Sequence, residues 1–154
     1  MRGQTRSGAL ASGNGKRAGG LGSVVARFSR HEVLIEGDAQ GLQTLLVWLE
    51  TGGSGGEFEF SVPDAVPAPY EGFLVACAKS AAPDESLLLC HDGVMLHLRG
   101  GAQVFSKFVK YFRSAIGLLL RENSPDESTH FHVSYYEDHP FLNAESDELI
   151  VELL

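Results

Sequence analysis

Cysteine is scarce in this chain, which has 154 residues and two cysteines, Cys77 and Cys90. The two are thirteen positions apart and form no C-x-x-C motif. Two cysteines are too few for the disulfide framework of a small secreted domain, and a single bridge between them is the alternative to two free thiols. Both cysteines lie in apolar, strand-like stretches, so we expect free, buried thiols in a reducing, cytoplasmic compartment.

Long apolar runs are also missing, since stretches such as residues 115–120 are far shorter than the about 18 apolar residues that a membrane span needs. Glycine is frequent, but no G-x-G-x-x-G motif leads from a strand into a helix, and no P-loop is present. No G-x-S-x-G motif or suitably placed cysteine supplies a nucleophile. We therefore expect a protein that does not enter a membrane and binds no cofactor.

Acidic residues are absent from the first 23 positions. The whole chain has a net charge of −8, from 12 basic and 20 acidic residues. Four of the basic residues lie in this segment, so the net charge of residues 24–154 is 8 − 20 = −12. An acidic body repels nucleic acid and favours a basic protein partner. The segment is rich in glycine and serine, so we expect a disordered tail over residues 1–23 and one domain over residues 24–154. Its basic residues are Arg2, Arg6, Lys16 and Arg17.

Two segments of the chain resemble each other, IEGDAQGLQTLLVWL from Ile35 and LRGGAQVFSKFVKYF from Leu98. In both, apolar residues recur at positions i, i+3, i+4 and i+7, which form one face of an α-helix. Asp38 is a good N-cap for the first helix, because its carboxylate can accept from free backbone N–H groups. Glycines at 52 and 53 end that helix, and the second extends to about Arg121.

Strand patterns flank each predicted helix. EVLIE and VMLHLR precede the helices, the alternating segments EFEFSV and HFHVSYY follow them, and GFLVACA and ELIVELL come next. A hairpin that turns at Asp92 and Gly93 connects the halves. The order predicts two β-α-β-β repeats, over about residues 31–78 and 94–153, plus a connecting hairpin strand. We therefore expect an α+β fold, with an antiparallel or mixed sheet and both helices on one face.

Side chains alternate between the two faces of a strand, so the same pattern predicts which residues face outward. Phe58 and Phe60, and likewise Phe131 and Val133, face the helices. The opposite face then carries acidic and imidazole side chains. We predict a partner-binding surface there and in the turn that follows, with the candidate residues Glu57, Glu59, His130, His132, Tyr136 and His139.

Histidine also allows an alternative, a small metal-binding protein or metal-dependent enzyme. An H-x-H pair on one strand, here His130 and His132, can supply two ligands to one ion, and His97 or Glu59 is a candidate third ligand. No cysteine completes a familiar metal-site spacing, so solvated or hydrogen-bonded histidines on a polar face are the favoured interpretation. His139 precedes Pro140, which favours a surface turn from which the next two residues fold back onto the core. A third alternative is self-association through exposed strand edges.

The C-terminal part of the chain resembles a family of small bacterial proteins. The stretch HFHVSYYEDHPFLNAESDELIV is similar to the end of immunity proteins from polymorphic toxin systems, in the group numbered thirty-two. The segment IEGDAQGLQTLLVWLE is similar to the strand, Gly-Asp and helix with which that group opens. These matches span about a third of the chain. The matching C-terminal residues are His130, His132, Tyr136, residues 139–142, Ser146 and residues 149–151.

The resemblance implies a non-enzymatic, cytoplasmic protein that binds and neutralises a cognate protein toxin. The acidic body is consistent with a toxin whose surface is basic. None of the matching residues forms a catalytic motif. The basic tail and the segment FEFSVPDAVPAPYEGF are not features of the family.

Overall fold

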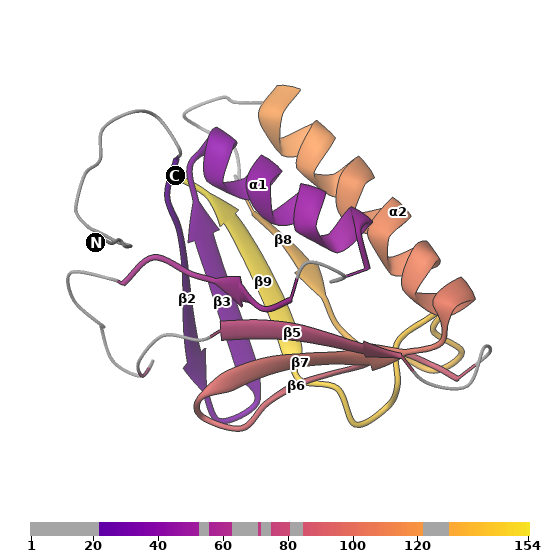
Figure 1. Cartoon of the computed structure of the whole chain (residues 1–154). Coiled ribbons are helices and arrows are strands. Elements are labelled where there is room, and N and C mark those ends of the chain that lie inside the picture. Colours follow the sequence, from indigo (N-terminus) through magenta and orange to yellow (C-terminus); the bar gives the residue numbers. More distant parts are fainter. Residues whose placement is uncertain (1–21, 53–55, 63–70, 72–74, 81–84, 122–129) are drawn as a thin grey trace.

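The fold is α+β, as the sequence predicts (Figure 1). The computed structural model describes residues 22–52, 56–62, 71, 75–80, 85–121 and 130–154. The tail predicted to be disordered falls outside these residues, apart from Gly22 and Ser23. The elements are β2 (Val24–Ser29), β3 (Glu32–Gly37), α1 (Ala39–Glu50), β4 (Phe58–Glu59), β5 (Val75–Ser80), β6 (Leu88–His91), β7 (Met95–Gly100), α2 (Ala102–Arg121), β8 (His130–Val133) and β9 (Glu148–Leu153).

Both helices lie where the apolar periodicity places them. The carboxylate of Asp38 accepts a hydrogen bond from the backbone N–H of Gly41 at 2.7 Å, so the predicted N-cap of α1 is confirmed. Helix α1 ends just before Gly52, which has a φ of +68°. The stripe of α2 that contains Phe108 and Phe112 is buried, as predicted. None of the described helices is long and apolar enough to cross a membrane.

The described strands form two mixed sheets, with the orders β2-β3-β9-β8 and β4-β5-β7-β6. Strands β3 and β9 pair in parallel, as do β5 and β7, and the other neighbours are antiparallel. Each sheet thus combines one hairpin from the first half of the chain with one from the second half. Helices α1 and α2 lie side by side over the first sheet, and the second sheet lies below them (Figure 1).

The structure agrees with two β-α-β-β units and adds a strand that the sequence analysis does not predict. This strand, β2, pairs with β3 in the way that β6 pairs with β7. The repeated unit is therefore β-β-α-β-β, and the predicted connecting strand is the first strand of the second unit. The structure also differs in having two sheets where one was expected. Strands β4 and β8 are shorter than predicted, ending at Glu59 and Val133.

One buried cluster of apolar side chains holds these layers together, with members from both helices and both sheets. Its largest fully buried members are Phe108, Phe112, Leu42, Leu87, Leu89, Ile116, Leu149, Val33 and Val151.

The chain between β8 and β9 closes the outer edge of β6. The N–H of Leu87 donates to the carbonyl oxygen of Phe141 at 2.7 Å, and the N–H of Asn143 donates to that of Leu87 at 2.7 Å. Phe141 and Leu142 are buried, so the prediction that they fold back onto the core is confirmed.

Candidate functional site

The outer face of the first sheet carries the imidazole pair that the sequence highlights. His130 and His132 are exposed on β8, while Val133 is buried, as alternation along the strand requires. The two rings are 5.0 Å apart between centroids. Strand β8 is the last strand in the order of its sheet, so the pair lies at an edge that a partner can reach.

A carboxylate on the neighbouring strand orients one of these rings. Nδ1 of His132 lies 2.7 Å from Oε2 of Glu148, and the hydroxyl of Ser134 donates to the same oxygen at 2.9 Å. The hydrogen bond from His132, helped by that from Ser134, lowers the pKa of Glu148 below its ordinary value. The imidazole is therefore held in one orientation on the surface rather than free to rotate.

A tight turn follows β8 and presents two tyrosines. Tyr135 and Tyr136 are 42% and 59% exposed. The N–H of His139 donates to the carbonyl oxygen of Tyr136 at 3.0 Å, and Asp138 within this turn has a φ of +64°. Residues with side chains seldom adopt such a conformation, although aspartate tolerates it better than most. Strain of this kind persists only where the surrounding structure enforces it.

His139 enforces the turn. Its Nδ1 accepts hydrogen bonds from the N–H groups of Phe141 and Leu142, at 3.2 and 3.0 Å. Its ring lies 4.5 Å between centroids from the rings of Tyr136 and Phe141. Burial lowers the pKa of His139, in agreement with a neutral ring whose Nδ1 is an acceptor. We call His130, His132, Tyr135, Tyr136 and His139 the histidine–tyrosine surface.

The two acidic candidates are not part of this surface. Glu57 and Glu59 are exposed, but they lie at β4, which belongs to the second sheet. One continuous sheet, as predicted from the sequence, would bring them beside the histidines, but the described strands form two sheets. Parallel pairing of β3 with β9 and of β5 with β7 separates the two groups instead.

The three histidines of the alternative metal site also lie on different sheets. His97 lies on β7 of the second sheet, where its Nε2 is 3.0 Å from Oδ2 of Asp92. It therefore does not join His130 and His132. Among the described residues, no three His, Cys, Asp or Glu side chains are placed to hold a metal ion.

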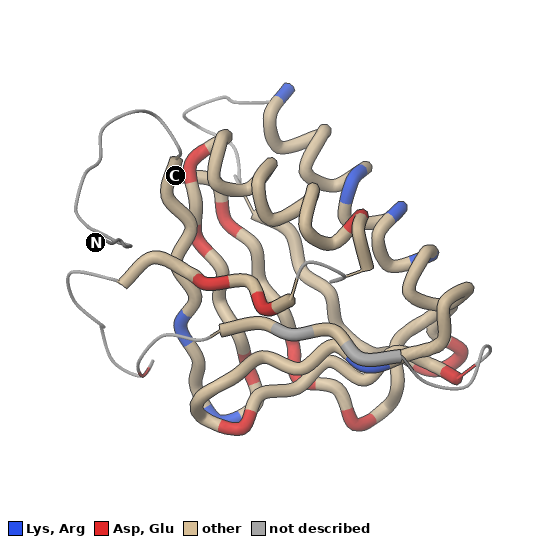
Figure 2. The backbone as a smooth tube through the Cα atoms, viewed as in Figure 1, with Lys and Arg blue, Asp and Glu red and all other residues tan. Residues whose placement is uncertain are grey.

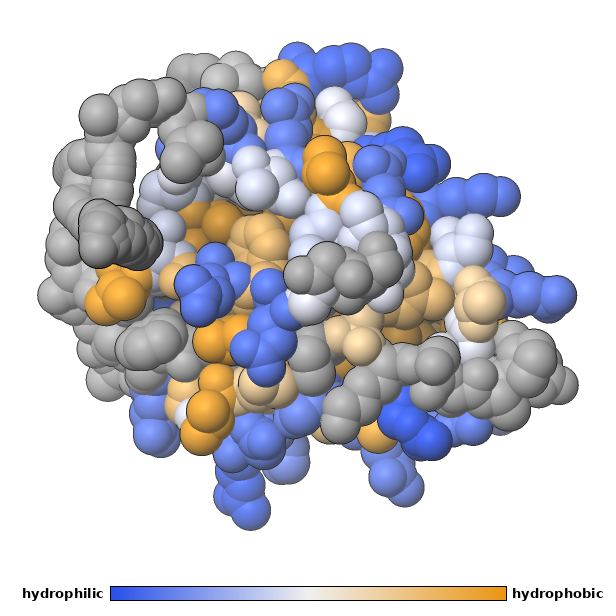
Figure 3. Space-filling view, in the orientation of Figure 1, coloured by the Kyte–Doolittle hydropathy of each residue, from blue (hydrophilic) through white to orange (hydrophobic). Residues whose placement is uncertain are grey.

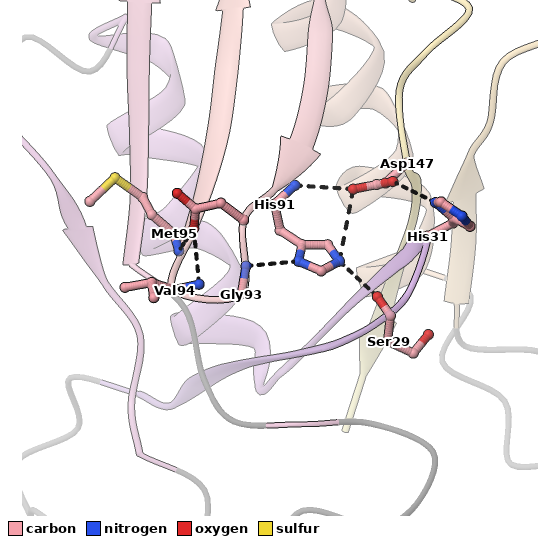
Figure 4. A network of polar contacts seen from close by, with 8 residues as sticks. Ser29, His31, His91, Gly93, Val94, Met95 and Asp147 are labelled. Atoms are coloured by element: carbon pink, nitrogen blue, oxygen red, sulfur yellow. Dashed lines mark hydrogen bonds and ion pairs between the residues drawn. The ribbon is translucent and has the colours of Figure 1, made fainter.

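A polar junction that was not predicted from the sequence lies between the two sheets (Figure 4). His91, at the end of β6, is 9% exposed in its side chain, and its ring is 4.7 Å from that of Phe28 between centroids. The N–H of Gly93 donates to Nδ1 of His91 at 3.2 Å, so the proton of the neutral ring is on Nε2. Nε2 in turn donates to the carbonyl oxygen of Ser29 at 2.7 Å.

Asp147 completes this junction from the start of β9. Its Oδ2 accepts from the backbone N–H of His91 at 3.0 Å, and its Oδ1 lies 3.6 Å from Nδ1 of the exposed His31 (Figure 4). The neighbouring Cys90 is a free thiol whose pKa is raised, first by burial and then by the charges of Asp147 and Asp92. A thiol with a raised pKa is a poor nucleophile. The hydrogen bonds of His91 with Ser29 and Asp147 link the two sheets.

The sequence does contain a signal for the junction. Val24, Ala26 and Phe28 alternate in the manner of a strand with one buried face, and they indicate β2. A hairpin of β2 and β3 requires a turn near His31, which is where the chain meets Asp147.

No family model, curated protein or solved structure matches the chain.

Proposed function

We propose that the chain is a non-enzymatic binding protein that neutralises a cognate bacterial toxin domain in the cytoplasm. The observation that supports this function best is the rigid turn that presents Tyr135 and Tyr136. Tyrosine is enriched at interface hot spots, and a side chain that is already ordered loses less entropy on binding. The resemblance of the C-terminal part of the chain to immunity proteins points to the same function.

A shallow apolar groove extends the histidine–tyrosine surface along α2. It has a volume of 310 Å³ and lies between this helix and β8. Tyr111 and Leu118 in its wall are 40% and 47% exposed, and the hydroxyl of Tyr111 donates to the carbonyl oxygen of His132 at 3.1 Å. Protein-binding surfaces typically combine exposed apolar side chains with ordered polar groups, as this groove does.

Co-expression with the product of the neighbouring reading frame tests this function. We expect a stable complex of the two proteins in size-exclusion chromatography with light scattering, and we expect the chain to restore growth to cells that express the partner. Failure to form a complex and failure to restore growth would together refute the proposal.

Self-association through the edge of β8 is the competing use of the same groove, because unpaired strand edges favour pairing with another strand. Light scattering of the chain alone separates the two functions. A monomer at micromolar concentration supports heterologous binding, whereas a dimer that the substitution His132→Pro converts to monomer supports self-association.

A further inference from the structure

A second groove lies on the part of the molecule where α1 approaches β4. It has a volume of 520 Å³ and is open to solvent. Figure 3 shows apolar surface exposed on this side of the molecule, bordered by hydrophilic side chains. The described lining residues come from the chain before β2, from β2, α1 and the segment around β4, and they are Gly22, Val24, Gly41, Thr44, Glu57, Phe58, Glu59 and Ser61.

The charged side chains among the described lining residues of this groove are all acidic. Glu57 and Glu59 are both exposed in its wall, and Figure 2 shows acidic residues along this segment of the backbone. The carboxylate of Asp38 lies beside its mouth, where it accepts from the backbone N–H of Ser23 at 3.1 Å. No lysine or arginine is among the described lining residues. The groove therefore offers a negative potential to a cationic segment.

Hydrogen bonds of Ser23 hold the chain beside the groove, next to Gly22 in its wall. Besides the bond to Asp38, the carbonyl oxygen of Ser23 accepts from the N–H of Asp38 at 3.0 Å. A Cβ atom on Gly41 would overlap that same carbonyl group, so α1 needs glycine at this position. Gly22 has a φ of +76° and itself lines the groove. The residues that precede it in the sequence thus start at the groove.

We propose that this groove binds the chain's own basic N-terminal segment, residues 1–21, through ion pairs of Lys16 and Arg17 with Glu57 and Glu59. The segment has four basic residues and no acidic ones. Lys16 and Arg17 are six and five positions before Gly22. An extended chain of this length spans roughly 20 Å, which is enough to reach any part of the groove.

The short connection also makes this contact favourable. Closing a loop of about six residues costs less entropy than binding a separate peptide, because the effective concentration of a tethered segment is in the millimolar range. The groove is then occupied from within the molecule, and a basic segment of another protein has to displace it. This inference does not depend on the toxin-binding proposal, which concerns the other sheet.

Backbone amide chemical shifts of the full-length chain test the contact from the side of the tail. We expect the substitution pair Lys16→Gln and Arg17→Gln to move the resonances of the groove residues, including Gly41, Thr44 and Ser61, and to leave those of the second helix unchanged. The pair Lys107→Gln and Lys110→Gln, on the exposed face of α2, is the control and should leave the groove resonances in place.

Trypsin tests the contact from the side of the groove, because it cleaves after Lys16 and Arg17. We expect the pair Glu57→Gln and Glu59→Gln to raise the rate of this cleavage about three- to tenfold, as the loss of two exposed ion pairs predicts. The pair Glu137→Gln and Glu145→Gln, in exposed positions outside the groove, should leave the rate unchanged.

Both results are required. Unchanged groove resonances in the tail variant, or an unchanged cleavage rate in the groove variant, would overturn the proposal. A groove that responds to an added peptide of residues 12–21 but not to the tail substitutions would belong to a different molecule, which also overturns it.

Discussion

The imidazole of His91 joins the two sheets, because its Nε2 donates to the carbonyl oxygen of Ser29 over 2.7 Å. His91 ends β6 in the second sheet and Ser29 ends β2 in the first. The same ring accepts from the N–H of Gly93 and packs against Phe28. One side chain therefore satisfies two backbone groups and fills space between the layers.

We expect the substitution His91→Ala to lower the free energy of unfolding by about 2–4 kcal/mol, from the lost packing and the unsatisfied backbone groups. Urea unfolding followed by circular dichroism measures this change. His130→Ala is the matched control, and it should change the stability by less than about 0.5 kcal/mol because that ring is exposed. Equal effects of the two substitutions would contradict the structural role of His91.

Two glycines in helices should respond to alanine in opposite ways. In Gly41→Ala the new Cβ atom overlaps the carbonyl group of Ser23, so we expect a loss of about 2–3 kcal/mol in stability. Gly117 lies inside α2 with open space around its Cα, so Gly117→Ala should stabilise by about 0.5–1 kcal/mol through helix propensity. Thermal unfolding of both variants checks the signs, and a stable Gly41→Ala protein would refute the close approach of Ser23 to α1.

Acidification should loosen the turn around His139. Burial lowers the pKa of this histidine in the folded state, so the unfolded state binds more protons at mildly acidic pH. The stabilising contribution is therefore complete above the unfolded pKa of about 6.5, and it falls as the pH drops from there through the folded pKa. Protonation of Nδ1 also breaks the bonds from Phe141 and Leu142.

Nuclear magnetic resonance titration of the histidine side chains measures this effect. We expect His139 to titrate below the value of an unstructured histidine, about 6.5, and the amide signals of Phe141 and Leu142 to shift with the same midpoint. A midpoint for His139 equal to that of an unstructured peptide would show that the turn does not depend on the neutral ring.

The histidine–tyrosine surface makes a prediction about affinity. If the chain binds its partner there, Tyr136→Ala should weaken the complex by about 10- to 100-fold, which is typical of an aromatic hot spot. Calorimetric titration of the partner measures the change. Val94→Ala is the control, since Val94 is 69% exposed in the turn of the other sheet. Equal affinities of the two variants would place the binding site elsewhere.

Local features of this protein follow from the sequence by itself. The apolar stripes of α1 and α2, the cap at Asp38 and the outward direction of His130 and His132 depend on residues a few positions apart. Helical and strand periods specify such features directly, because each is a property of a single element.

The division of the strands into two sheets was decided by the tertiary structure alone. Alternation shows which face of a strand is buried, but it does not show that β3 pairs with β9 or that β5 pairs with β7. Because of this strand pairing, Glu57 and Glu59 lie at a different sheet from the imidazole pair of His130 and His132. It also buried His91, whose hydrogen-bond partner lies 62 residues away in the sequence. Pairing between distant segments depends on how the whole core packs, and no short stretch of sequence contains that information.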